Sequence, residues 1–572
     1  MTYRAPVSEF RFLFDHVVGL DQVTATERFA EAAGDVADAI LAEAGRMCEE
    51  VLAPLQRVGD QHPAVLENGI VRTSPGFADG YRAIAEGGWI STSAPPEYGG
   101  MGLPQALTTA VNEMMASACL SLQLNPLMTQ GQIEALEHHA SEELKALYLP
   151  KLISGAWSGT MNLTEPQAGS DLGALRARAE PAGDGTYRIS GQKIFISWAD
   201  NDFTENVCHL VLARLPDAPP GTKGISLFMV PKRIPNPDGS VDATNSLRVV
   251  SLEHKMGLHG SPTAVMEYDG ATGWMVGAPH AGLAAMFTMM NNARLGVGVQ
   301  GIGVAEGAFQ KALAFALERR QGRAPIENPT GTIIDHADVR RMLMTMKAET
   351  FAARAIALAN AIATDMERAT GSADWAARAA LLTPITKAFG TETGMKVAEL
   401  GMQVHGGMGY IEETGAAQFY RDVRVTAIYE GTNGIQAMDL VGRKMRDGGE
   451  AAFRLIDEIE KDAEAARGRL PALAGPVWDA AETLRETTEW LVAQGEINER
   501  FAGAIPFLRA FARVLGGHYH LRAAIAEGGK GPRTALARFY ITRLLPEHSG
   551  LCAHARAGAA DLYALAPEEF AA

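Results

Sequence analysis

The most informative stretch of this chain is residues 428–436, which read Ile-Tyr-Glu-Gly-Thr-Asn-Gly-Ile-Gln. It places one carboxylate, that of Glu430, between an aromatic ring and a glycine, with hydroxyl and amide side chains just beyond. Burial in an apolar pocket disfavours a charged carboxylate, so the pKa of such a group rises toward the range useful for a general base. The same residue types are also typical of a surface turn. The stretch alone leaves both interpretations open.

Five other motifs accompany this stretch and give it context. In chain order they are 161–171 (MNLTEPQAGSD), 191–197 (GQKIFIS), 291–294 (NNAR), 318–320 (ERR) and 403–410 (QVHGGMGY). No one of them is specific, but the set is, because it resembles the flavin-dependent acyl-CoA dehydrogenase family in order and spacing over residues 80–445. A tail of more than 100 further residues marks the chain as similar to the long-form members of that family.

The resemblance implies an α+β fold of four parts. They are a helical N-terminal domain (1–157), a middle β-barrel or β-sandwich domain (158–275), a C-terminal four-helix bundle that carries Glu430 (283–448) and an additional helical domain (449–572). Hydrophobic patterning supports this division. Strands are predicted at 192–198, 207–214, 225–230 and 247–252, where β-branched residues and turn signals concentrate. From residue 283 onward the apolar positions recur at helical spacing.

Local signals also predict where helices begin and end. In the first part, helices are expected at 26–53, 107–120 and 134–152. In the tail, breaks are expected at 475–476, 516–517 and 529–532, because glycine and proline interrupt helices. The tail also separates its charges: residues 457–499 are acidic, whereas residues 500–556 hold nine Lys or Arg and two Glu. We expect these two blocks to pair on adjacent helices or across subunits; attraction to CoA phosphates or a membrane surface is the alternative.

Composition narrows the class of protein. At 572 residues the chain is too long for a single core. A net charge of −16 argues against a nucleic-acid partner, which would require a basic surface. The four cysteines are widely spaced and are expected to be reduced structural thiols, with no metal site. The first 14 residues lack a signal-peptide pattern, and no apolar run is long enough to span a bilayer. We therefore expect a cytoplasmic protein without stable membrane insertion.

The chemistry implied by the resemblance is α,β-dehydrogenation of an acyl-CoA thioester to the 2-enoyl-CoA. No amino-acid side chain accepts a hydride, so a cofactor must, and the resemblance implies FAD. Glu430 matches the family's base for the α-proton. Its own backbone N–H is implied to stabilise the enolate-like carbonyl oxygen, a charge that needs donors placed beforehand. Gly431 is assigned to the substrate side of the same turn.

Several residues match the family's flavin contacts. Small residues in the 164–171 loop let backbone N–H groups approach a ligand closely, although a glycine-containing loop capped by Asp171 would look similar. Phe195 stands where the family commonly has Trp and Ser197 where it has Thr; alternatively, Phe195 is an inward residue of a strand. The assigned flavin contacts in this part of the chain are Met161, Thr164, Gly169, Ser170, Phe195 and Ser197.

A second group of residues resembles the segments that reach the ADP half of FAD on a neighbouring subunit. Arginine suits a pyrophosphate because its fork donates two hydrogen bonds, but cations are also common at helix C-termini for electrostatic reasons alone. Gly434 stands where many members of the family have Gln, so no adenine-side contact is assigned beyond Thr432. This group implies a homodimer or a dimer of dimers. It comprises Arg319, Gln403, Gly406, Gly407 and Thr432.

Substrate contacts are implied for Ser170, Asn291, Arg294 and Gly431, and Lys232 with Arg233 are candidates for the CoA phosphates or a solvated strand end. Residues 1–7, 128–132 and 253–262 are similar to those of long-form members that act on 3-(methylthio)propionyl-CoA in dimethylsulfoniopropionate demethylation. The methionines of residues 286–290 suggest either a soft substrate lining or core packing.

Other functions stay open from sequence alone. The physiological electron acceptor implied by the resemblance is electron-transfer flavoprotein. The alternatives are a short- or medium-chain acyl-CoA dehydrogenase, an acyl-CoA oxidase, and a non-catalytic flavin-binding protein that uses residues 500–556 to bind nucleic acid.

Overall fold

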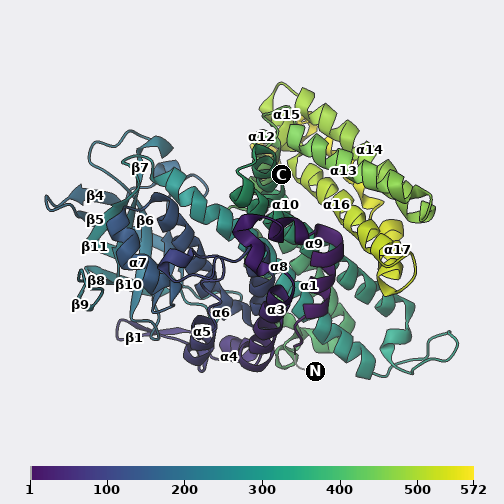
Figure 1. The fold of residues 1–572 in the computed structure, drawn as a ribbon, viewed down its shortest axis with the longest axis horizontal. Coiled ribbons are helices and arrows are strands. Elements are labelled where there is room, and N and C mark those ends of the chain that lie inside the picture. The colour runs from purple at the N-terminus through teal and green to yellow at the C-terminus, as the bar shows by residue number, and fades with distance from the viewer. Residues whose placement is uncertain (1–2, 572) are drawn as a thin grey trace. The chain divides into compact units, whose positions relative to one another are not determined.

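The structure is a computed structural model that describes residues 3–571 (Figure 1). Met1, Thr2 and Ala572 lie outside the described residues. The first two residues of the predicted 1–157 domain and of the 1–7 stretch, and the last residue of the predicted 449–572 domain, are therefore not described. The described chain divides into two compact units. The β unit comprises residues 3–5 and 40–296, and the helical unit comprises residues 6–39 and 297–571.

Helices dominate the first 153 residues. They are α1 (Val7–Leu13), α2 (Asp21–Thr24), α3 (Asp35–Met47), α4 (Leu55–Gln61), α5 (Phe77–Glu86), α6 (Gln105–His139) and α7 (Glu142–Ile153), with a small hairpin of β1 (Val65–Glu67) and β2 (Ile70–Arg72) between α4 and α5.

Three expectations for this region are wrong. The single helix expected at 26–53 is broken, because Ala33 is extended and Gly34 is left-handed, so that α3 starts afresh at Asp35. The helix expected at 107–120 does end close to an interruption, because Cys119 inside α6 has a non-helical backbone. The single helix expected at 134–152 is instead divided: α6 runs to His139, and α7 starts after Ser141, whose Oγ accepts from the Leu144 N–H. The hairpin at β1 and β2 lies in a part that was expected to be helical throughout.

The middle of the chain forms a seven-stranded sheet. Its strands are β3 (Trp157–Asn162), β4 (Arg178–Pro181), β5 (Tyr187–Ser197), β6 (Asn206–Arg214), β7 (Ile225–Pro231), β10 (Leu247–Leu252) and β11 (Thr263–Val276), while β8 (Arg233–Pro235) and β9 (Val241–Thr244) form a separate ladder. The pairings β11–β5–β4–β6–β7 return to β11, so five strands close into a small barrel. Its interior is apolar, with Ile189, Val211, Phe228 and Val230 fully buried. All four predicted strands are confirmed.

Long helices make up the rest of the chain. Those before the tail are α8 (Gly282–Glu318), α9 (Ala337–Thr370), α10 (Ala373–His405), α11 (Ala416–Val423) and α12 (Asn433–Gly442). Those of the tail are α13 (Glu450–Arg467), α14 (Pro471–Ala493), α15 (Ile497–Ala502), α16 (Ala504–Ala526), α17 (Pro532–Arg543) and α18 (Glu547–Ala555). The predicted α+β class, with a helical start, a middle sheet and two helical parts after it, is confirmed.

The tail packs onto the bundle through α16, which contacts α9, α10 and α12 and is flanked by α14, α17 and α18 (Figure 1). The break expected at 516–517 is wrong, because both glycines lie inside α16. A Cβ at Gly516 would stand 2.2 Å from the Tyr540 hydroxyl oxygen, and one at Gly517 would crowd Leu545. These glycines allow close helix packing instead of ending a helix. The break at 475–476 is also wrong, since α14 continues through Pro476, its sixth residue.

The expected pairing of the two charge blocks of the tail is confirmed. Arg522 of α16 lies 2.8 Å from Glu458 and 2.7 Å from Asp462, both on α13. A second ionic contact joins tail and bundle: Arg513 and Lys396 lie 2.7 and 2.8 Å from the fully buried Glu349 of α9. Burial would raise the pKa of Glu349, but the two cations outweigh it and hold that pKa at about 2.

All four cysteines are free and buried, as expected of structural thiols. None of the helices within residues 3–571 has both the length and the apolarity to cross a bilayer. Among the same residues, no group of three or more His, Cys, Asp or Glu side chains is arranged to hold a metal ion.

Candidate active site

Glu430 lies in a left-handed turn directly before α12. Its φ is 56° and that of Gly431 is 82°. A left-handed backbone costs a residue with a side chain about 1–3 kcal/mol, so it persists where surrounding contacts hold it, and it concentrates at active sites. Thr432 follows as the N-cap of α12, its Oγ1 accepting from the Ile435 N–H at 3.2 Å. A plain surface turn would favour glycine at this position; here the half-buried Glu430 occupies it.

Two buried side chains hold the backbone of this turn. Lys387, on α10, donates from Nζ to the Gly431 carbonyl oxygen at 2.9 Å and to Asn433 Oδ1 at 3.0 Å. Gln436, one turn into α12, donates from Nε2 to the Glu430 carbonyl oxygen at 3.2 Å. The turn is thus tied both to its own helix and to a neighbouring one.

Tyr429 anchors the chain on the other side of Glu430. Its hydroxyl donates to Gln300 Oε1 at 2.5 Å. Burial raises the pKa of the Tyr429 hydroxyl well above its ordinary value, and the adjacent Glu430 raises it further. The hydroxyl therefore remains protonated and able to donate. Sequence reasoning missed both Gln300 and Lys387, although a lysine among the apolar residues of 381–389 was a detectable signal.

In the β unit, a buried ion pair fastens the loop that carries the predicted flavin contacts. Lys193 Nζ lies 2.8 Å from Glu165 Oε1, and both side chains are almost wholly inaccessible. The same carboxylate accepts from the backbone N–H groups of Arg176 and Ala177. Burial lowers the pKa of Lys193 to about 8, against the opposing effect of Glu165. Burial would raise the pKa of Glu165, but Lys193 and the two N–H groups outweigh it and the pKa is lowered.

Phe195 is displayed on the surface of the β unit. Its side chain is 60% exposed although it belongs to β5, and its φ is 61°. The alternative that Phe195 is an inward strand residue is therefore wrong. Ile194, just before it, donates its N–H to the Thr164 carbonyl oxygen at 2.9 Å, which ties β5 to the 164–171 loop. Ser197, two residues on, is half-buried. A strained, exposed aromatic ring next to a fixed loop suits a flat ligand that stacks on it.

Three of the predicted cofactor-binding glycines have no packing reason to be glycine. A Cβ added at Gly169, Gly406 or Gly407 would meet nothing within 4 Å. By contrast, a Cβ at Gly298 or Gly301 inside α8, or at Gly390 inside α10, would clash with neighbouring backbone. Open space beside a glycine leaves room for a ligand or a second chain to approach the backbone. Met161 and Thr164 are half-buried, and Ser170 is exposed.

The residues assigned to the ADP half of FAD are accessible in the helical unit. Arg319, just after α8, and Gln403, in the last turn of α10, are both exposed. His405 has a structural role instead. Its Nδ1 lies 2.7 Å from the Gly401 carbonyl oxygen, and its ring stacks on that of Phe315 with 4.5 Å between the ring centroids.

The predicted substrate residues of α8 lie together in the β unit. Asn291 is exposed and its Oδ1 lies 3.4 Å from Nη1 of the buried Arg294, whose guanidinium also lies over the Phe287 ring. Met286 and Met289 are fully buried, so they are core residues and not an accessible lining.

Lys232, a candidate for the CoA phosphates, is engaged within the β unit. Its amino group hydrogen-bonds the carboxylate of the buried Asp200. This contact supports the alternative interpretation, that of a strand end tied into the fold. Arg233, the other candidate, is half-buried, and its backbone N–H and C=O both bond the Asn206 side chain.

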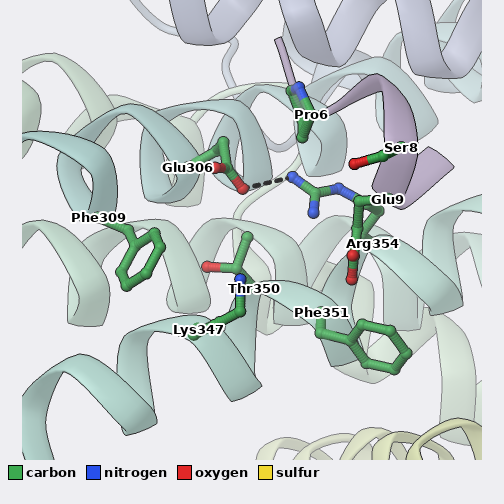
Figure 2. A pocket seen from close by; sticks show the side chains of 9 residues that line it. All are labelled: Pro6, Ser8, Glu9, Glu306, Phe309, Lys347, Thr350, Phe351 and Arg354. Carbon is green, nitrogen blue, oxygen red and sulfur yellow. Dashed lines mark hydrogen bonds and ion pairs between the residues drawn. The ribbon is translucent and has the colours of Figure 1, made fainter. Parts of the chain in front are cut away.

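A cavity of about 140 Å³ lies in the helical unit (Figure 2). Arg354 projects into it and pairs with Glu306 at 2.7 Å, while Glu9 and Lys347 line it as well. The two acids and two bases balance in charge. None of the predicted site residues lines this cavity, and we assign it no role in the chemistry.

Comparison with known proteins decides the family. Models of the acyl-CoA dehydrogenase N-terminal, middle and C-terminal domains match residues 35–156, 160–271 and 280–445, and a model described as "Acetyl-CoA dehydrogenase C-terminal like" matches residues 455–566. The chain is 48% identical, over 93% of both sequences, to the 3-methylmercaptopropionyl-CoA dehydrogenase of Ruegeria pomeroyi. The chain belongs to the acyl-CoA dehydrogenase family.

A second relative supports this membership, and a solved structure shares the fold. A butyryl-CoA dehydrogenase of Syntrophomonas wolfei is 32% identical, covering 95% of each chain. The structure of Caenorhabditis elegans ACDH-11 in complex with C11-CoA shares the fold, with a TM-score of 0.79, 21% identity and coverage of 94% of this chain and 91% of that one. As an acyl-CoA dehydrogenase, this protein is an FAD-dependent oxidoreductase that dehydrogenates acyl-CoA thioesters. Its exposed Phe195 and open glycines fit the ring and phosphates of such a cofactor.

The ion pair under the flavin loop gives a testable expectation for this acyl-CoA dehydrogenase. Lys193→Met keeps a similar side-chain length but leaves the buried Glu165 carboxylate without its cation. Removing one partner of a buried pair costs about 3–5 kcal/mol. We expect a lower thermal midpoint and weaker FAD retention, measured by melting and by cofactor content after gel filtration. The matched change Lys232→Met, at the more exposed pair with Asp200, should cost less and leave FAD content unchanged. Equal FAD loss in both variants would contradict the specific role of Lys193.

Proposed function

We propose that this protein oxidises 3-(methylthio)propionyl-CoA to methylthioacryloyl-CoA, with Glu430 as the base. The observation that carries the proposal is the left-handed turn in which Glu430 is held by contacts from two helices, in the motif that matches the family's base. The 48% identity to a 3-methylmercaptopropionyl-CoA dehydrogenase supports the substrate. On that basis the reaction belongs to dimethylsulfoniopropionate demethylation.

In the proposed reaction, the Glu430 carboxylate removes the α-proton of the thioester. FAD, when bound, accepts the β-hydrogen together with its electron pair, so that a carbon–carbon double bond remains. The Glu430 backbone N–H donates to the thioester carbonyl oxygen as negative charge develops there. The fixed turn places both groups before the substrate arrives, which lowers the entropy cost of reaching the transition state.

We assign the remaining contacts by motif and by exposure. Phe195 stacks on the flavin ring, Ser197 donates toward it, and backbone groups around Gly169 approach its polar edge. Asn291 and Arg294 serve the substrate side together with Ser170 and Gly431. Arg319, Gln403, Gly406 and Gly407 are proposed to reach the ADP half of FAD from a neighbouring subunit, and Met161, Thr164 and Thr432 complete the set.

We further propose the cellular setting. Electron-transfer flavoprotein re-oxidises the cofactor, the protein is a cytoplasmic homodimer or dimer of dimers, and no nucleic acid or metal takes part. The four domains are proposed at 1–157, 158–275, 283–448 and 449–572.

A substrate panel tests the proposal. A thioether sulfur has roughly the size and polarity of a methylene, and one methylene in an apolar pocket is discriminated by only about 10- to 200-fold. We therefore expect turnover of both methylthiopropionyl-CoA and valeryl-CoA, the first equal or better, and weak turnover of palmitoyl-CoA. The measurement is anaerobic flavin bleaching followed by kcat/KM for each substrate.

The second candidate is a dehydrogenase of straight short chains, which the 32% identity to a butyryl-CoA dehydrogenase favours. A kcat/KM for butyryl- or valeryl-CoA well above that for methylthiopropionyl-CoA would select it. A clear preference for palmitoyl-CoA would overturn both assignments. Peroxide formation at the rate of turnover would instead indicate an oxidase.

A further inference from the structure

Lys387 is a fully buried lysine on α10, with no exposed side-chain area. It lies among apolar neighbours, with Ile385 and Ala388 also fully buried. Burying an amino group is unfavourable unless it is hydrogen-bonded. Its Nζ finds two acceptors at the start of α12, the Gly431 carbonyl oxygen at 2.9 Å and Asn433 Oδ1 at 3.0 Å.

One of these acceptors belongs to the strained part of the turn, and the other lies two residues after it. Glu430 and Gly431 both have left-handed backbone, and neither strand nor helix hydrogen bonds fix that conformation. Gln436 Nε2 reaches the carbonyl oxygens of both residues, at 3.2 and 3.4 Å. The direction of the Glu430 side chain depends on these backbone angles, because a rotation about either one swings the carboxylate through space.

Asn433 extends this hydrogen-bond network along α10. Its Nδ2 donates to Thr391 Oγ1 at 3.1 Å, and Thr391 lies one turn beyond Lys387 on the same helix. The first turn of α12 is therefore held from two successive turns of α10. A lysine that only satisfied its own burial could use any nearby carbonyl oxygen; this one reaches across to the residue that follows the base.

We propose that Lys387 is a positioning residue for catalysis: it holds the Gly431 carbonyl so that the Glu430 carboxylate and backbone N–H are aimed at the substrate. The inference rests on the proposed role of Glu430 as the base. Gln436 assists from within α12. Lys387 itself touches neither the substrate nor the cofactor in this role; it acts through the turn.

The test compares two Lys→Met variants on the same helix. Lys387→Met keeps the chain length but removes both donated hydrogen bonds. Lys396 lies nine residues beyond Lys387 on α10 and contacts no residue of the turn. Lys396→Met removes its ion pair to Glu349. Misplacing a reacting group by about 1 Å costs roughly 100-fold in rate. We expect the rate constant of anaerobic flavin reduction to fall about 10- to 100-fold in Lys387→Met, with FAD content and acyl-CoA affinity retained, and to stay at the wild-type value in Lys396→Met.

A double-mutant comparison separates positioning from general damage. On a Glu430→Gln background, Lys387→Met should lower the residual reduction rate by a smaller factor than on the wild-type background, because the carboxylate is already inactive and only the backbone N–H remains to be positioned. An equal loss on both backgrounds, or wild-type reduction by Lys387→Met, would overturn the inference.

A second variant keeps the test valid if Lys387→Met does not fold. Gln436→Met removes the side chain that donates to the Glu430 and Gly431 carbonyl oxygens, and it should show the same selective loss, larger on the wild-type background than on the Glu430→Gln background. Failure of the proposed function is a separate outcome: Glu430→Gln would then reduce its flavin normally, whatever Lys387→Met does.

Discussion

Glu430→Gln is expected to bind FAD and acyl-CoA but to lose flavin reduction. The amide is nearly isosteric with the carboxylate and keeps the backbone N–H of the turn, yet it cannot accept the α-proton. General-base catalysis contributes about 10²- to 10⁴-fold, so the rate constant for flavin bleaching should fall by at least that range. The measurement is single-turnover reduction under anaerobic conditions, with FAD content determined from the absorbance of the released cofactor.

The matched control is Glu413→Gln, which makes the same chemical change at an exposed carboxylate of the helical unit. Its reduction rate should equal that of the wild type. Near-normal bleaching by Glu430→Gln would place the base elsewhere, and Glu412 and Glu413 would be the next residues to test. A preparation that lacks FAD would instead show that the change disturbs the turn.

Deleting residues 450–572 is expected to give an insoluble or misassembled protein. The deletion removes five apolar side chains of α16 that are no more than 1% exposed: Phe507, Leu508, Phe511, Val514 and Leu515. Each such side chain contributes about 1.5–3 kcal/mol, so the five supply on the order of 10 kcal/mol, comparable to the whole stability of a typical domain. The deletion also removes Arg513 and leaves the buried Glu349 with Lys396 alone.

A shorter deletion provides the control for this experiment. Residues 564–571 are almost entirely exposed, and their removal should leave solubility, melting and oligomer size unchanged. The measurements are soluble yield, thermal midpoint and size-exclusion volume. A soluble deletion of 450–572 with an unchanged oligomer and only weaker substrate affinity would contradict a structural role and make the tail a CoA-binding element.

Much of the site could be predicted from sequence because local chain chemistry specifies it. The run 428–436 supplies a carboxylate, a glycine and an N-cap in that order, and Thr432 does cap α12; the five accompanying motifs single out Glu430 as the candidate base. The strands at 192–198, 207–214, 225–230 and 247–252 were predictable for a similar reason, since β-branched residues and the turns between them are local signals.

Glycine and proline were less reliable guides, because their effect depends on what lies next to them in space. Gly516 and Gly517 suggest a break when only neighbours in sequence are considered. In the folded protein they lie inside α16, where Tyr540 and Leu545 pack too closely for a side chain. The interruption at Ala33 and Gly34 shows the opposite case, in which an alanine-rich sequence with high helix propensity does not form one helix.

The sequence by itself determined the class of cofactor and the order of the domains and predicted Glu430 as the base, because several short motifs, each made of residue types within a few positions of one another, occur together in one order. Only the tertiary structure decided what holds the base in place. Lys387 and Gln300 lie 43 and 130 residues before Glu430 in the chain, and nothing local links them to the turn. They contact it because α8, α10 and α12 pack together and bury polar groups that must then find partners.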